Sequence, residues 1–138
     1  MKRLKIILYW LIHITWGFPT FLYGSLITLY MLLTMHKPHI FGFGVYFVSK
    51  KLYNCGFEAG PFFVISKDCE NSLPLKQHEH GHGLQTLWWG PLTLFVITIP
   101  SMIRFNYRRI KHKTYPPYDS IWFEGQATKL GKKYFLEG

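Results

Sequence analysis

The chain has 138 residues, which is enough for one compact domain and too few for two. Hydrophobic residues make up 49%, aromatic residues 19% and charged residues only 17%, which disfavours a conventional soluble globule and favours a protein at a membrane–water boundary. The net charge is +9, but basic residues cluster beside apolar stretches at 2–5 and 104–113, which favours membrane lipid over a nucleic-acid partner.

The first part of the chain, residues 1–37, predicts a membrane anchor. Residues 6–34 contain no Asp, Glu, Lys or Arg, and this run exceeds the roughly 20 apolar residues that span a bilayer. It is also too long and too aromatic for a cleaved signal peptide. Gly17 and Pro19 near its middle predict a kink or a re-entrant path. The remaining residues, 38–138, are then expected to form the functional domain.

Short runs of β-forming residues follow the anchor. The sequences VYFVS at 45–49 and FFVIS at 62–66 are set apart by glycines, and they predict two strands of a hairpin or a small sheet. Cys55 and Cys69 lie in the same segment, where a disulfide and two thiols are both compatible with the sequence. Neither cysteine belongs to a CxxC pair, so a cysteine-based zinc site is not expected.

Two helices and an apolar segment are predicted after these strands. The first helix begins at Ser72 or Pro74, since proline is tolerated in the first turn, and it ends near Gly90. An apolar segment at 84–103 overlaps the end of this helix and is barely long enough to cross a membrane. The chain then becomes polar and basic, and a last helix is predicted from about 119 to 133.

The sequence His78-Glu79-His80-Gly81-His82 matches the HExxH motif. On a helix, His78 and His82 lie on one face, where their imidazoles can hold one Zn²⁺ ion. Zinc lowers the pKa of a bound water toward about 7, and Glu79 is placed to take the proton of that water as a general base. His80 points away from this face, so we expect it to be no ligand and at most to support the site or an interface.

These residues resemble a largely uncharacterised group of small bacterial membrane proteins. That group shares an HExGH motif, a GPL segment and a late Glu-x-x-Ala helix near a Leu-Gly pair; the matching residues here are 78–82, Gln85, 90–92, 99–101, 124–127 and 130–131. The resemblance covers roughly residues 40–131 and implies a gluzincin-like zincin fold in a bacterial inner or plasma membrane. In gluzincins the third zinc ligand is a glutamate on a later helix, which implies Glu124 here.

Two residues near Glu124 bear on how the site is supported. Asp119 lies about one helical turn earlier, and it is predicted to orient a ligand histidine through a hydrogen bond. Members of the group often carry an acidic residue directly after the alanine, where this chain has Thr128. The chain departs from the group at this position, so the supporting role of that acidic residue does not carry over to Thr128.

The shared metal site constrains the apolar segment. If 84–103 crossed the bilayer once, His82 and Glu124 would lie on opposite sides, because no apolar segment returns the chain. Gly90, Pro91 and Pro100 interrupt the segment, and irregular backbone is tolerated in a membrane only where protein covers it. We therefore expect a re-entrant or interfacial segment.

The combined prediction is an α+β membrane protein with an N-terminal transmembrane anchor, a small hairpin or sheet, a zincin-like active-site helix, a re-entrant or interfacial segment and a late glutamate helix. The predicted reaction is zinc-dependent hydrolysis of peptide bonds in a membrane-associated peptide or protein. This substrate is predicted to add as a strand to an edge strand formed by Phe62, Phe63, Val64 and Ile65. The alternative is a non-enzymatic membrane protein with a structural or interaction zinc site. Glu79 favours the enzyme, because structural zinc has no use for a general base.

Overall fold

The protein has an α+β fold in the computed structural model, which describes residues 1–53, 55–114 and 116–135. Within these ranges the helices are α1 (Lys2–Thr15), α2 (Phe18–Leu33), α3 (Leu73–Trp89), α4 (Ile99–Ile110) and α5 (Trp122–Tyr134). The strands are β1 (His39–Phe41), β2 (Gly44–Ser49), β3 (Gly56–Ala59) and β4 (Phe62–Ser66). Short helical turns lie between them: η1 (Lys67–Cys69), η2 (Gly90–Leu92), η3 (Leu94–Thr98) and η4 (Tyr118–Ser120).

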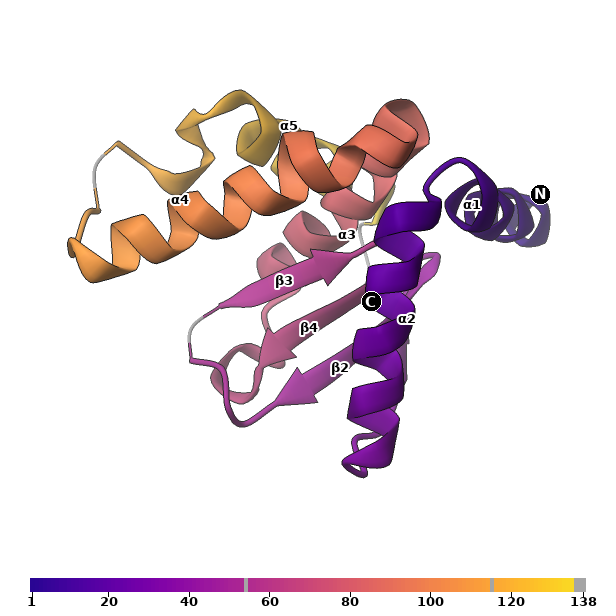
Figure 1. Ribbon diagram of the computed structural model, residues 1–138, viewed down its shortest axis with the longest axis horizontal. Coiled ribbons are helices and arrows are strands. Elements are labelled where there is room, and N and C mark those ends of the chain that lie inside the picture. The colour runs from indigo at the N-terminus through magenta and orange to yellow at the C-terminus, as the bar shows by residue number, and fades with distance from the viewer. Residues whose placement is uncertain (54, 115, 136–138) are drawn as a thin grey trace.

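A small mixed sheet lies between two helices (Figure 1). Its strand order is β1-β2-β4-β3, with β2 and β4 parallel and the other pairs antiparallel. Side chains alternate between the faces of a strand, so Val64 of β4 packs with Met31 of α2 on one face. Phe63 and Ile65 pack with Leu84 of α3 on the other face. Helix α5 packs against α3, on the side away from the sheet.

The N-terminal apolar run is two helices rather than one continuous anchor. Helices α1 and α2 meet at an angle of 100°, and the break that Gly17 and Pro19 predict is confirmed. Pro19 lies in the first turn of α2, where its missing N–H costs no hydrogen bond. A Cβ atom at Gly17 would lie 2.5 Å from Thr86 Cγ2, so glycine allows the bend to pack against α3.

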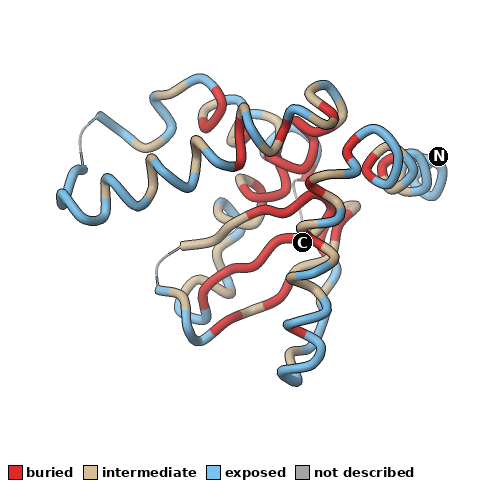
Figure 2. Tube along the Cα trace, viewed as in Figure 1, coloured by how far each residue is buried: buried red, intermediate tan, exposed pale blue. Residues whose placement is uncertain are grey.

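Membrane crossing by one straight helix is not seen in the described part of the chain. None of its helices combines the length and the apolar character that a crossing requires. Two bent pairs meet these criteria jointly: α1 with α2, and the helical residues Leu73–Leu92 with Leu94–Ile110, which are bent by 117°. Exposed residues are frequent along α1, α2 and α4, whereas buried residues concentrate in the central strands and α3 (Figure 2).

The segment 84–103 turns back on itself rather than continuing as one helix. Helix α3 ends at Trp89, and Gly90 adopts φ +52°, a conformation that favours glycine. A Cβ atom at Gly90 would lie 2.1 Å from Cε2 of Trp16, so this turn also needs a residue without a side chain. The chain passes through η2 and η3 into α4, which lies beside α5 in Figure 1.

The predicted edge strand is wrong. The strands expected at 45–49 and 62–66 are present as β2 and β4, but β4 pairs with β2 on one side and β3 on the other. Phe62, Phe63, Val64 and Ile65 therefore have no free backbone edge. The cause is the tight turn at Gly60 (φ +69°), which folds β3 back onto β4. The edge strand on this side of the sheet is β3.

Candidate metal centre

Helix α3 carries the HExxH residues. It begins where the sequence predicts, with the Ser72 hydroxyl accepting a hydrogen bond from Leu75 N at 3.3 Å and Pro74 in the first turn. His78 and His82 are one helical turn apart, and their ring centroids are separated by 4.8 Å. The placement of both imidazoles on one face of a helix is confirmed.

A close crossing of α3 and α5 brings Glu124 next to His78 and His82. A Cβ atom at Gly81 would lie 1.9 Å from Ala127 O, and one at Gly131 would lie 1.9 Å from Gln77 O. Both distances are far below van der Waals contact, so any larger residue would push the helices apart. Glu124 lies on α5 one turn before Ala127, which places its side chain against α3.

Three donor atoms converge at this crossing. Glu124 is fully buried, and its Oε2 atom lies 2.9 Å from His78 Nε2 and 3.1 Å from His82 Nε2. One donor atom from each of these residues lies within 4.8 Å of the other two. The structure thus brings together the three residues that the sequence predicts as metal ligands.

Gln85 fixes the tautomer of His82. The Gln85 amide nitrogen donates both hydrogens, to Phe123 O and to Gln126 Oε1, each at 2.9 Å. Its Oε1 atom can only accept, and His82 Nδ1 lies 2.8 Å from it and must carry the hydrogen. The Nε2 lone pair of neutral His82 therefore points toward Glu124 and is available to a metal ion.

Thr128 and Asp119 fix the tautomer of His78 in the same way. The Thr128 hydroxyl donates its one hydrogen to Asp119 Oδ2 at 2.6 Å, and it lies 2.8 Å from His78 Nδ1. The hydroxyl oxygen must therefore accept from His78 Nδ1–H, which leaves Nε2 of the neutral ring unprotonated. Asp119 orients His78 through Thr128 rather than directly. Thr128 thus supports the orientation of His78 through its hydroxyl group.

Two hydroxyl groups hold the other oxygen of Glu124. Its Oε1 atom accepts hydrogen bonds from Ser101 Oγ of α4 and, at 3.2 Å, from Tyr118 Oη of η4. These bonds fix the carboxylate plane, so Oε2 is aimed at the histidines. Tyr118 was not predicted from the sequence, because its position depends on how η4 packs against α4 and α5.

A carboxylate buried as fully as Glu124 needs a positive charge beside it, because burial away from water is otherwise costly. Burial raises the pKa of Glu124, but when protons rather than a metal ion lie between Oε2 and the two Nε2 atoms, hydrogen bonds from His78 and His82 outweigh burial and hold that pKa well below its usual range. Burial lowers the pKa of His82, while the hydrogen bond and charge of Glu124 raise it, for a net value of about 9. A proton or a metal ion satisfies this requirement, and two imidazole nitrogens with one carboxylate oxygen are a donor set that zinc takes in catalytic sites.

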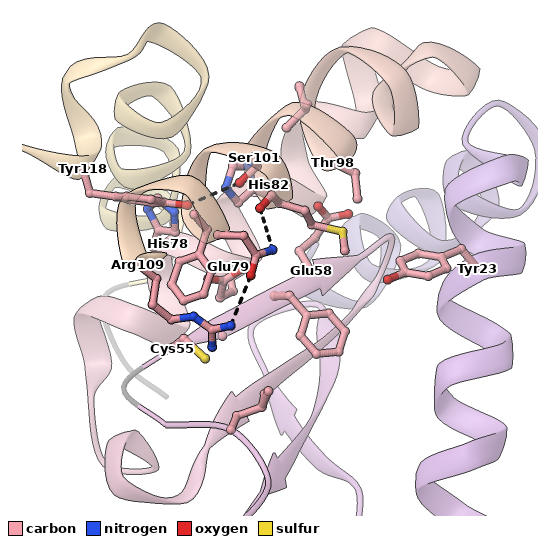
Figure 3. Close-up of a pocket in the computed structure, with 17 residues that line it drawn as sticks. Tyr23, Cys55, Glu58, His78, Glu79, His82, Thr98, Ser101, Arg109 and Tyr118 are labelled. Carbon is pink, nitrogen blue, oxygen red and sulfur yellow. Dashed lines mark hydrogen bonds between the residues drawn. The ribbon is translucent and has the colours of Figure 1, made fainter. Parts of the chain in front are cut away.

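Glu79 lies beside the three converging residues and lines a cavity (Figure 3). A Cβ atom at Gly56 would lie 3.2 Å from Glu79 Cγ, so the absence of a side chain there lets Glu79 lie against edge strand β3. Burial is the main cause that raises the pKa of Glu79, with the nearby histidines acting in the opposite direction.

The cavity is about 240 Å³ in volume and runs between β3, α3 and α4. Its lining includes His78, Glu79 and His82 from α3, as well as Glu58, Ser101 and Arg109 from other elements. Apolar side chains such as Ile97 and Phe105 form much of the remaining wall. The candidate centre therefore has an open side, onto a space that can hold part of a second molecule.

His80 lies in the hydrophobic core, away from the three converging residues. Its ring stacks on Phe135 with 3.9 Å between centroids, and its Nε2 atom accepts a hydrogen bond from Phe43 N at 2.9 Å. Burial lowers the pKa of His80 to about 3, so the ring is neutral. The observed contacts of His80 join α3 to the segment before β2, and they include none with His78, His82 or Glu124.

Comparison of the chain with known proteins gave no significant match to a family model, a curated protein or a solved structure.

Proposed function

We propose that the protein is a zinc-dependent enzyme that hydrolyses peptide bonds, with His78, His82 and Glu124 as the zinc ligands. The observation that carries this proposal is the convergence of two imidazole Nε2 atoms on one buried carboxylate oxygen, at 2.9 and 3.1 Å. Both rings are held by their Nδ1 atoms, so their Nε2 lone pairs are available for metal binding. Catalytic zinc sites commonly combine three such protein ligands with one open position.

Glu79 supplies the acid–base chemistry. When bound, zinc would act as a Lewis acid toward a water molecule and the carbonyl of the substrate. Glu79 accepts the proton of the attacking water as the new carbon–oxygen bond forms, and it transfers that proton to the amine nitrogen as the carbon–nitrogen bond breaks. Burial raises the pKa of the Glu79 carboxyl, and a carboxylate with a raised pKa is a stronger base toward the attacking water.

The open cavity favours an enzyme over the non-enzymatic alternative. Structural zinc sites are usually closed by four protein ligands, whereas the cluster of three potential ligands here borders a cavity of about 240 Å³. A buried carboxylate such as Glu79, 6% exposed, is costly to place beside a site that serves structure alone.

Edge strand β3 is the proposed binding site for the peptide backbone. It borders the cavity through Gly56, Phe57 and Glu58, and one of its sides has no neighbouring strand in the part of the chain that the structure describes. An extended peptide can pair with such an edge through backbone hydrogen bonds. Gly56 lies against Glu79, so a peptide paired there would present a bond near the general base.

Membrane association is the second part of the proposed function. Leu26 and Leu33 of α2 are 61% and 73% exposed, and Ile103 and Ile110 of α4 are 66% and 68% exposed. Arg108 and its neighbours place positive charge at the end of α4, where anionic head groups would lie. We propose that these helices lie at a membrane surface, and that the substrate is a membrane-associated peptide or protein.

Metal analysis of detergent-purified protein, combined with mass spectrometry of a peptide mixture, tests the catalytic proposal. We expect about one zinc ion per chain, lost in His82→Ala and Glu124→Ala. Glu79→Gln should keep the metal and lower the hydrolysis rate at least about 100-fold. Glu70→Gln is the matched control, because it removes an exposed carboxylate outside the cavity and should change neither quantity.

Three results would contradict parts of this proposal. Metal content that is unaffected by His82→Ala would exclude the site itself. Hydrolysis that survives Glu79→Gln would exclude the assigned general base. Zinc bound at the site without hydrolysis of any peptide in the mixture would favour the non-enzymatic alternative.

A further inference from the structure

Glu58 is a buried carboxyl group on the wall of the cavity. It lies on β3 and is only 6% exposed, and Figure 3 shows it between His82 and Tyr23. Its Oε1 atom accepts a hydrogen bond from Gly60 N at 2.8 Å, within the turn between β3 and β4. Its Oε2 atom receives no hydrogen bond from the residues that the structure describes.

The turn does not explain why this residue is a glutamate rather than a glutamine. A neutral amide would accept the same bond from Gly60 N, and it would avoid the cost of placing a carboxylate away from water. Arg109 is the cavity-lining arginine, but it lies on the far side of Glu79 from Glu58 (Figure 3) and donates to Asn106 Oδ1 at 3.4 Å. Among the described residues, the positive charge of His82 acts on Glu58, but His82 Nε2 points to Glu124 at 3.1 Å, so no cation donates a hydrogen bond to Glu58.

The register of the sheet places Glu58 close to the bond that would be cleaved. Glu58 pairs with Phe63 and Gly56 pairs with Ile65, so both face α3, as Phe63 and Ile65 do. Gly56 abuts Glu79, and two residues of a strand span about 7 Å. A peptide that pairs with β3 beside Glu79 would therefore have one of its groups next to Glu58. That group would belong to a residue within about two positions of the cleaved bond.

We infer that Glu58 forms a substrate subsite that binds a cationic group, either the side chain of a lysine or arginine or a free amino terminus. A buried carboxylate and an ammonium or guanidinium group make a charge-assisted hydrogen bond that a neutral group cannot replace. The inference rests on the proposed function, since it assigns the substrate class of the same site: peptides with a positive charge close to the cleaved bond.

Calorimetric binding to zinc-loaded Glu79→Gln protein tests the inference without turnover. The probes are alanine-based hexapeptides with one lysine at each position in turn, each paired with a peptide that has norleucine instead. Both sets are used with free and with acetylated amino termini. We expect a preference of at least about tenfold for a cation at one position. A preference for lysine identifies a side-chain cation, and a loss of binding on acetylation identifies the amino terminus.

Glu58→Gln in the same protein is the decisive comparison. Glutamine keeps an acceptor for Gly60 N, so the turn is preserved and only the charge is removed; circular dichroism checks the fold. The preference should fall to near unity, with unchanged affinity for the norleucine peptides that have acetylated termini. Equal affinity for charged and neutral peptides, or a preference that survives Glu58→Gln, overturns the inference.

The design separates this inference from the proposed hydrolysis. Glu58-dependent binding by a protein that cleaves none of the peptides would uphold the subsite and reject the peptidase. Cleavage by the unmodified protein without any preference for charge would uphold the peptidase and reject the subsite.

Discussion

Each histidine of the candidate centre depends on a partner at its Nδ1 atom. Gln85 lies one turn after His82 on the same helix, so its contact follows from spacing alone. Thr128 lies 50 residues after His78 and on another helix, so only the packing of α5 reveals it. The His82 ring is therefore held by a contact within its own helix, whereas the His78 ring is held by a tertiary contact with α5. The orientations of the two rings should differ in their sensitivity to changes in α5.

Replacing Thr128 with valine tests the support of His78. Valine has the same shape but no hydroxyl, so His78 Nδ1–H loses its acceptor and the ring loses its fixed orientation. We expect zinc affinity to fall about 10- to 100-fold, measured by competition with a chromophoric chelator. Thr128→Ser keeps the hydroxyl and is the matched control. Equal dissociation constants for the two variants would show that the hydroxyl does not support the metal site.

The buried carboxyl of Glu58 makes stability depend on pH. Burial is the main cause that raises its pKa from 4.5 to about 7. Between these values the folded state binds more protons than the unfolded state, so stability falls as pH rises from about 4.5 to about 7 and does not recover above that range. Glu58→Gln removes this cost, and it should raise the free energy of unfolding by about 3 kcal/mol at pH 8 and by little at pH 4.

Denaturant unfolding of both proteins at the two pH values, in one mild detergent, measures this difference. Glu70→Gln serves as the control, since its carboxylate is exposed in a surface ion pair and should change stability little at either pH. A gain from Glu58→Gln that is the same at pH 4 and pH 8 would show that ionisation of Glu58 is not its cause.

At the scale of elements, the crossing of α3 and α5 positions the third ligand. Gly81→Ala would place a methyl group against the backbone oxygen of Ala127, so the helices must separate. We expect the free energy of unfolding to fall by about 2 kcal/mol, although alanine by itself favours helix. Zinc affinity should fall as well, because Glu124 moves away from the histidines.

Lys132→Ala on the exposed side of α5 is the control for this variant, and it should leave both quantities near their original values. Chelator competition and denaturant unfolding measure the two effects. If Gly81→Ala retained full zinc affinity, Glu124 would not depend on the close crossing.

Local patterns made part of this fold predictable. The helix start at Ser72, the strands at 45–49 and 62–66, and a late helix all follow from turn chemistry and short-range periodicity. Strand β3 was missed because its sequence, Gly-Phe-Glu-Ala, has little β propensity of its own. It is a strand because the turn at Gly60 pairs it with β4, and for the same reason β4 is not an edge.

The candidate site divides in the same way. His78, Glu79 and His82 were predicted from the spacing of one motif. Glu124 was predicted from the resemblance of its Glu-x-x-Ala sequence to the late helix of gluzincins. Tyr118 and Glu58 were not predicted, because no spacing along the chain relates them to the motif. Tyr118 contacts Glu124 only after η4 packs, and Glu58 enters the cavity only through the register of β3.

At the scale of the whole molecule, exposed apolar side chains lie on the sides of helices that face away from the sheet. The outer side of α2 includes Leu26 and Leu29, which are 61% and 54% exposed. Replacing both with glutamine should lower binding to anionic vesicles at least about tenfold, because each leucine loses its favourable transfer out of water. Vesicle flotation measures this binding.

Tyr134→Gln is the matched control for vesicle binding. Tyr134 is 51% exposed, but it lies on α5, whereas α2 covers the opposite face of the sheet. This variant should float with vesicles as the unmodified protein does. Undiminished flotation of the double leucine variant would exclude α2 as the membrane contact.

Because the ligands of the candidate centre come from both α3 and α5, a bound ion would cross-link two helices whose ligand residues are up to 46 positions apart. During synthesis, the donor set is complete only after α5 has left the ribosome and docked, so metal uptake would be a late step in maturation. Detachment of α5 would remove Glu124 from the donor set, so local unfolding of this helix would shorten the lifetime of the metal complex. Variants that speed amide exchange in α5 should then also speed zinc dissociation.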